Sequence, residues 1–106
     1  MHKLIYSNQA KIDLDDAISH IAEGSVSNAL SYLTNYNKKI ELLILNPYMG
    51  VECKNKLIQR DCRVLIYESH IIIYRVDDIL SNILIIRIYH GSANYANKFN
   101  KDKINE

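Results

Sequence analysis

The sequence is poor in residues that interrupt or cross-link a chain: its 106 residues include three glycines, one proline and two cysteines. Two cysteines are too few for a disulfide framework or for a zinc site built from four cysteines. No apolar run approaches the roughly 20 residues that span a bilayer. We therefore expect a chain that folds without staples and uses neither a cofactor nor a membrane.

The N-terminal segment also lacks a feature, the apolar core of a signal peptide, because it turns polar directly after Tyr6. This predicts a cytoplasmic protein in which Cys53 and Cys62 stay reduced. A hydrophobic content of 48% and a charged fraction of 24% exclude a wholly disordered chain. The length predicts one domain with one core, here residues 1–91, followed by a polar tail over 92–106 that frays.

Two segments carry apolar residues at helical spacing. The first covers residues 8–23 and follows Ser7, which is a suitable N-cap. The second runs from Val26 to Ile44 and should end before Pro47, because a residue that precedes proline is pushed out of the helical region. Only Gly24 and Ser25 separate the two segments, so they should form an antiparallel hairpin.

Strand signals lie at residues 4–6, 63–67, 71–76 and 83–89, and the last three are joined by short polar connections. Short connections favour antiparallel pairing of neighbours. The resulting order β-α-α-β-β-β predicts an α+β domain in which a helical hairpin packs on one face of a small, mainly antiparallel sheet.

The net charge is only +1, but all four arginines lie in the second half of the chain. Alternation along residues 83–90 places the even-numbered residues from Leu84 to His90 on one face and the odd-numbered ones, including Arg87, on the other. If the hairpin covers the even face, several arginines converge on the open face. That face could bind RNA phosphate or a protein carboxylate. The alternative is cross-strand ion pairing with Glu68 and Asp77.

The motifs of several enzyme classes are missing. The histidines and cysteines lack the spacing of a metal site, and there is no glycine-rich phosphate loop or nucleophile elbow. The three aspartates of the first helix, Asp13, Asp15 and Asp16, lie where they complement the helix dipole, so we interpret them as structural. No metal site is expected.

Three short motifs occur in order: Asn46-Pro47-Tyr48-Met49-Gly50, the strand pair from Arg63 to Val76 with its Tyr74-Arg75-Val76 ending, and the segment Ile85 to Gly91 with its His90-Gly91 ending. With the element order, they resemble the RelE/ParE superfamily of bacterial toxins from type II toxin–antitoxin systems. The resemblance covers nearly the whole chain, most densely residues 46–91, and favours the ParE branch. The sequence departs from that branch at Ser92-Ala93-Asn94, where a charged pair is common.

A ParE-like toxin would inhibit growth by poisoning DNA gyrase without catalysis of its own, in a plasmid-stabilization role. A cognate antitoxin would neutralise it in a hetero-oligomeric complex. The RelE-like alternative is a ribosome-dependent mRNA endonuclease, with ribosome and mRNA as partners. A third alternative is an inactive toxin-like partner of an antitoxin.

Each alternative assigns roles to particular residues. RNA cleavage needs a base, an acid and a cation near the phosphate. The resemblance gives these roles to His90, Tyr95 and Arg87, with Arg63 as a second phosphate clamp. Another interpretation of His90 is a strand-end histidine that bonds to backbone. For binding of a target or phosphate, the candidates are the four arginines: Arg60, Arg63, Arg75 and Arg87.

Overall fold

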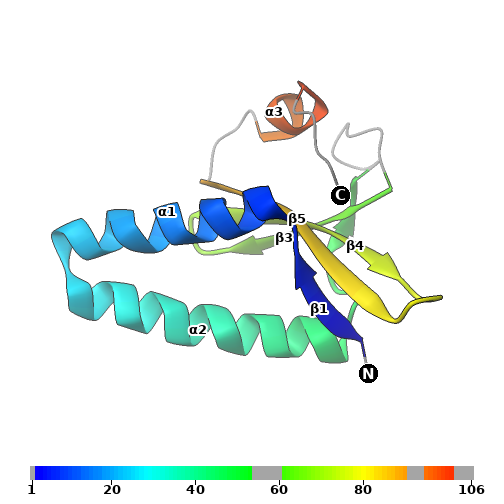
Figure 1. The fold of residues 1–106 in the computed structure, drawn as a ribbon, viewed down its shortest axis with the longest axis horizontal. Coiled ribbons are helices and arrows are strands. Elements are labelled where there is room, and N and C mark those ends of the chain that lie inside the picture. Colours follow the sequence, from blue (N-terminus) through cyan, green and yellow to red (C-terminus); the bar gives the residue numbers. More distant parts are fainter. Residues whose placement is uncertain (1, 54–60, 91–94, 102–106) are drawn as a thin grey trace.

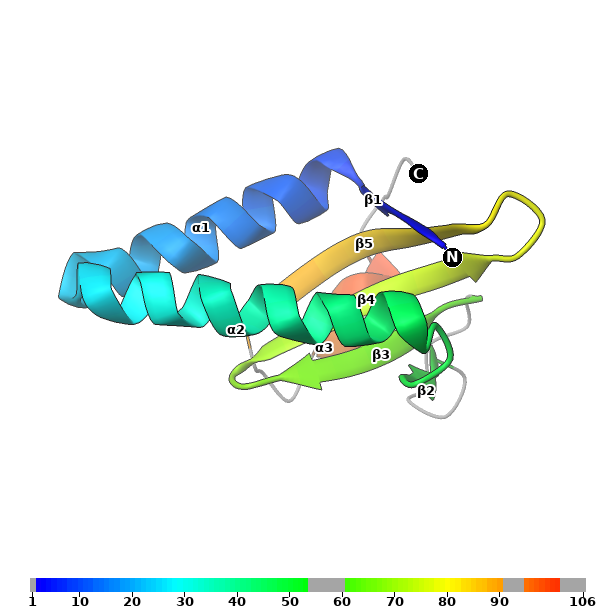
Figure 2. The same cartoon turned by 90° about the horizontal axis from the view of Figure 1, so that it is seen from below.

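The structure, a computed structural model, describes residues 2–53, 61–90 and 95–101. A five-stranded sheet lies between two layers of helices (Figures 1 and 2). Figure 2 shows α2 in front of the sheet and α3 behind it. The elements in chain order are β1 (Lys3–Tyr6), α1 (Asn8–Gly24), α2 (Val26–Leu45), β2 (Val51–Glu52), β3 (Arg63–Tyr67), β4 (His70–Asp77), β5 (Asn82–His90) and α3 (Tyr95–Lys101).

The sheet has the strand order β1-β5-β4-β3-β2, in which β1 runs parallel to β5 and the other neighbours are antiparallel. The predicted α+β fold, a helical hairpin on a mainly antiparallel sheet, is therefore confirmed. The structure adds the short strand β2 and the helix α3. None of the described helices is long and apolar enough to cross a bilayer.

Two serines explain where the long helices begin. The Ser7 hydroxyl accepts a hydrogen bond from the Ala10 backbone N–H at 3.0 Å, as predicted for an N-cap. Ser25 serves both helices: its backbone N–H donates to the Ile21 carbonyl at the end of α1, and its hydroxyl accepts from the Asn28 N–H at the start of α2. The two helices are therefore joined through a single residue.

Buried residues form two clusters, one on each face of the sheet, rather than the single core expected. The hairpin side holds large side chains such as Tyr36, Leu43 and Tyr74. The opposite side holds Ile73, Ile86 and the two cysteines, among others. A sheet covered on both faces explains why β5 has apolar residues in both phases of its alternation.

A β-bulge in β5 corrects the predicted alternation. Ile73 pairs with Arg87 and the next residue, Tyr74, pairs with Ile85, so Ile86 is an extra residue. Ile85 therefore packs on the hairpin side, whereas Ile86 lies in the opposite cluster. Before the bulge the odd-numbered residues Ile83 and Ile85 face the hairpin, whereas after it the even-numbered Ile88 does.

The predicted fraying of the tail is wrong for residues 95–101, which form α3. Its Phe99 is fully buried in the cluster opposite the hairpin, and Ala96, three residues earlier, packs against that cluster. Two apolar residues at helical spacing are enough to dock this otherwise polar helix. The division of the chain at residue 91 stays a prediction.

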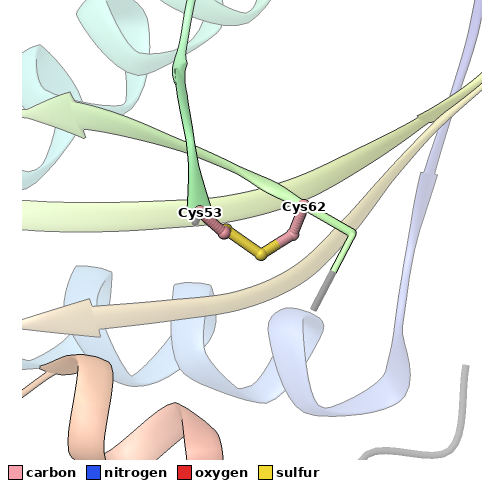
Figure 3. The surroundings of a disulfide bond; sticks show 2 residues. All are labelled: Cys53 and Cys62. Atoms are coloured by element: carbon pink, nitrogen blue, oxygen red, sulfur yellow. A yellow bond between two sulfur atoms is a disulfide. The ribbon is translucent and has the colours of Figure 1, made fainter. Parts of the chain in front are cut away.

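The two cysteines, expected as thiols, form a disulfide between β2 and β3 (Figure 3). The fold places them opposite each other one step beyond the Glu52–Arg63 pair, where the Cys53 N–H donates to the Cys62 carbonyl at 2.9 Å. Their Cα atoms are 5.2 Å apart, within the range that a disulfide bridges. Strand pairing thus explains the bond.

Candidate functional site

Arg63 is engaged by the turn that follows α2. Its Nη1 donates to the carbonyls of Tyr48 and Gly50, at 3.2 and 2.8 Å, and Nη2 lies 3.5 Å from a Glu52 carboxylate oxygen. The guanidinium also lies 4.8 Å from the centre of the Tyr48 ring. These contacts give Arg63 a structural role in holding this turn.

Tyr74 holds the same turn from the other side. Its hydroxyl donates to the Pro47 carbonyl at 2.8 Å and accepts from the Gly50 N–H at 2.9 Å. A Cβ at Gly50 would lie 2.6 Å from that hydroxyl and 2.8 Å from the Val64 carbonyl oxygen, so the position requires glycine. The motif residues around Gly50 and Tyr74 therefore form one packed unit.

The turn is also tied to the β4–β5 connection through Asp78. The Tyr48 hydroxyl donates to one carboxylate oxygen of Asp78, and the His2 ring lies 2.8 Å from the other. The hydrogen bond from Tyr48, followed by that from His2, lowers the pKa of Asp78. All three side chains are accessible at this end of the sheet, so the cluster joins the N-terminus to two turns.

Arg87 forms an ion pair with Asp13 of α1. Its Nε and Nη2 donate to the two carboxylate oxygens at 2.8 and 3.1 Å. The side chains are only 17% and 12% exposed, respectively. One of these oxygens also accepts the Ile88 backbone N–H at 2.9 Å. Asp13, interpreted from the sequence as a dipole-complementing residue, in fact holds β5 against α1.

The other two candidate arginines do not join Arg63 and Arg87 in one site. Arg75 shares the phase of Ile73 in β4 and therefore lies on the sheet face opposite the hairpin. Arg60 lies outside the described residues. The alternative prediction is cross-strand ion pairing with Glu68 and Asp77. Arg63 does lie near a carboxylate of the neighbouring strand, but that carboxylate belongs to Glu52, and Arg87 pairs with Asp13 of α1. The roles of the four arginines in target binding stay predictions.

His90 lies on the hairpin side of the sheet, directly opposite His70 in the neighbouring strand. The ring centres are 5.4 Å apart. The buried His70 is hydrogen-bonded through Nδ1 to the Tyr32 hydroxyl at 2.8 Å, and both histidines line a cavity between the helices and the sheet. Burial, followed by the neighbouring His90, lowers the pKa of His70. The sequence predicts a site role for His90 but for neither His70 nor Tyr32.

The candidate catalytic residues are not brought together in the described structure. As simple alternation predicts, Arg87 and His90 lie in opposite phases of β5, because both follow the bulge, and Arg87 is engaged by Asp13. Tyr95 begins α3, but its side chain lies outside the described part of the chain. Among the described residues, no three histidine, cysteine, aspartate or glutamate side chains gather closely enough to hold a metal ion.

Comparison with protein families is decisive for the assignment. The model described as "ParE toxin of type II toxin-antitoxin system, parDE" matches residues 4–95. The chain belongs to the ParE toxin family. Among curated proteins, no sequence relative matches this toxin.

Two solved structures resemble the fold of the toxin. The first, "Chromosomal ParDE TA system from P. aeruginosa", has a TM-score of 0.65 and 20% identity, over 87% of the toxin and 98% of that chain. The second is the toxin–antitoxin complex RelBE2 from Mycobacterium tuberculosis, with a TM-score of 0.54 and 18% identity, over 84% of the toxin and 96% of that chain. At these identities the likeness concerns the fold. The predicted membership of the ParE/RelE superfamily is confirmed.

Proposed function

We propose that this toxin is ParE-like and poisons DNA gyrase by binding, without covalent chemistry of its own. The observation that carries the proposal is the arrangement of two candidate catalytic residues, Arg87 and His90, on β5. RNA cleavage needs a cation close to the acid and the base. Here the Arg87 guanidinium is bound by Asp13 of α1. Arg87 and His90 also point to opposite faces of β5. The ParE family match supports the same choice.

We further propose that a cognate antitoxin neutralises the toxin in a hetero-oligomer within the cytoplasm. Both similar structures are described as toxin–antitoxin systems, which supports this partner. The toxin presents exposed apolar side chains along its helices, including Ile12, Leu30 and Leu45. An antitoxin segment that folds on binding would bury them.

Two parallel assays on the purified toxin test the mechanism. The first follows supercoiling by gyrase and the accumulation of cleaved DNA complexes. The second follows cell-free translation and maps cuts in the message. We expect gyrase poisoning with intact message. Cut message with normal supercoiling would overturn the proposal in favour of a RelE-like nuclease.

A His90→Ala variant separates the two mechanisms further. His90 is exposed, so its removal should leave the fold intact. A binding poison should keep most of its effect on gyrase, whereas a nuclease that uses this imidazole should lose most of its cleavage. The matched control is His20→Ala, which removes an exposed histidine from α1.

A further inference from the structure

The cavity that His70 and His90 line has a volume of about 790 Å³. Helix α1 and helix α2 form two walls, and the β3–β4 turn with the end of β5 forms the third. A cavity of this size accommodates a whole side chain or a small molecule. Most of its lining residues are polar, so it differs from a packing defect in an apolar core.

The charge of the lining is negative. Three carboxylates contribute, those of Asp13, Asp16 and Glu68, and no lysine or arginine is among the described lining residues. Asp13 is neutralised by Arg87, but Asp16 and Glu68 have no ion-pair partner within the described chain. Asp16 belongs to α1 and Glu68 to the β3–β4 turn, so the two uncompensated charges come from different walls. A cation in the cavity would meet negative charge from both walls.

A second hollow continues the cavity along α2 and shares Ser31 and Asn35 with it. Its other residues include Val26 and Leu30, whose side chains are 65% and 62% exposed. An acidic cavity beside exposed apolar side chains matches a polypeptide with a basic residue next to apolar ones. A small free amine would leave the apolar part uncovered.

We propose that this cavity receives a basic side chain, arginine above all, of a partner polypeptide whose apolar neighbours rest on Val26 and Leu30. Arginine fits better than lysine because its planar guanidinium can bond carboxylates on two sides and stack on the rings of Tyr32 or His90. The inference rests on the proposed function only for the identity of the polypeptide, which would be the antitoxin. The chemistry of the cavity is independent of gyrase.

A titration of the ¹⁵N-labelled toxin with short blocked peptides, followed by NMR, tests the proposal. The probes are acetyl-Leu-Arg-Leu-amide and the same peptide with citrulline, which keeps the shape of arginine without its charge. We expect the arginine peptide to bind at least about tenfold more tightly, since losing one good charged contact costs about 1.4 kcal/mol or more. The shifted amides should surround Asp16, Glu68 and Leu30.

The matched variants change the same number of charges in two places. Asp16→Asn/Glu68→Gln should remove the preference for arginine over citrulline. Asp15→Asn/Glu41→Gln, at exposed carboxylates that do not line the cavity, should keep it. Equal affinity for both peptides, or shifts elsewhere on the surface, would refute the proposal even if the first variant does not fold.

Free agmatine, which carries the guanidinium without a peptide, separates the two parts of the proposal. We expect it to bind at the same amides and more weakly than the arginine peptide. Equal binding of agmatine and peptide would refute the polypeptide assignment. The outcome is independent of the gyrase assay, so a failure of the proposed function and a failure of this inference are distinguishable.

Discussion

Replacing Arg87 by alanine should destabilise the toxin, although its sequence context suggests a surface contact for a target. The change leaves the Asp13 carboxylate, only 12% exposed, without its counter-ion. Removing one partner of a buried ion pair costs about 3–5 kcal/mol. Because neither side chain is fully buried, we expect the lower end, about 3 kcal/mol. For a domain of about this size, that lowers Tm by roughly 12 °C or more.

The reciprocal variant, Asp13→Ala, should lower the stability more than Arg87→Ala does. Asp13→Ala removes the carboxylate that accepts from Nε and Nη2 of Arg87, and it also removes the acceptor of the Ile88 N–H. An unsatisfied buried donor adds a cost of about 1–3 kcal/mol. Asp13→Asn, which keeps an oxygen for the Ile88 N–H, should fall between the two. The double variant Asp13→Ala/Arg87→Ala should cost less than the sum of the single changes.

Urea denaturation followed by circular dichroism measures these differences. The control is Glu23→Gln, which breaks the exposed contact between His20 and Glu23 and should change stability by less than about 0.5 kcal/mol. If Arg87→Ala has the wild-type midpoint but loses toxicity, the reasoning is refuted and Arg87 contacts the target. If stability and toxicity fall together in Arg87→Ala and Asp13→Asn, the arginine acts through the fold.

Three further predictions concern other parts of the structure. Gly50→Ala places a methyl group against the Tyr74 hydroxyl and should lower the free energy of unfolding by about 1–3 kcal/mol, measured by urea denaturation. Gly24→Ala, with open space around its Cβ, should be neutral or stabilising. Equal stabilities of the two variants would contradict the packing argument. Because burial lowers the pKa of His70, the unfolded chain binds its proton more readily, so stability should be complete above about pH 6.5 and fall as the pH drops through the lowered pKa. His70→Gln should flatten this dependence of stability on pH, and His20→Gln should not. If stability falls as steeply with pH in His70→Gln as in the wild type, His70 is not its source. Reducing the disulfide, which joins positions nine residues apart, should lower the free energy of unfolding by about 2.7 kcal/mol by the loop-entropy relation. Thermal denaturation with and without a thiol reductant measures the difference. Identical curves would show that the bond does not stabilise the fold.

The sequence predicts the local structure well where one residue decides the outcome. Ser7 begins a helix because its hydroxyl can accept a backbone N–H, and Pro47 ends one because of its effect on the preceding residue. The strand boundaries follow from polar turns between apolar runs. These features are short-range, so a single sequence contains them.

The site depends on long-range features that the sequence does not reveal. Residues 83–86 are apolar in both phases, so the bulge at Ile86 leaves no mark in the alternation. Asp13 and Arg87 are 74 positions apart, and either could have been a solvated charge. The cysteine prediction relied on the compartment rather than on strand register, which sets the two sulfur atoms opposite each other. The cavity likewise needs both long helices, the β3–β4 turn and the end of β5 in place.

The contacts of Ser7 and Asp13 also govern how the sheet resists aggregation. Strand β1 covers β5 as far as Ile85, and an uncovered strand edge is a template for intermolecular pairing. Here the Ser7 hydroxyl donates to the Ile86 carbonyl and Asp13 accepts the Ile88 N–H, so Ser7 and α1 continue the cover of that edge as far as Ile88. The opposite border is different, because β2 pairs with β3 only as far as Val64. A strand from another molecule, either of a partner or of an aggregate, would therefore pair with the open edge of β3.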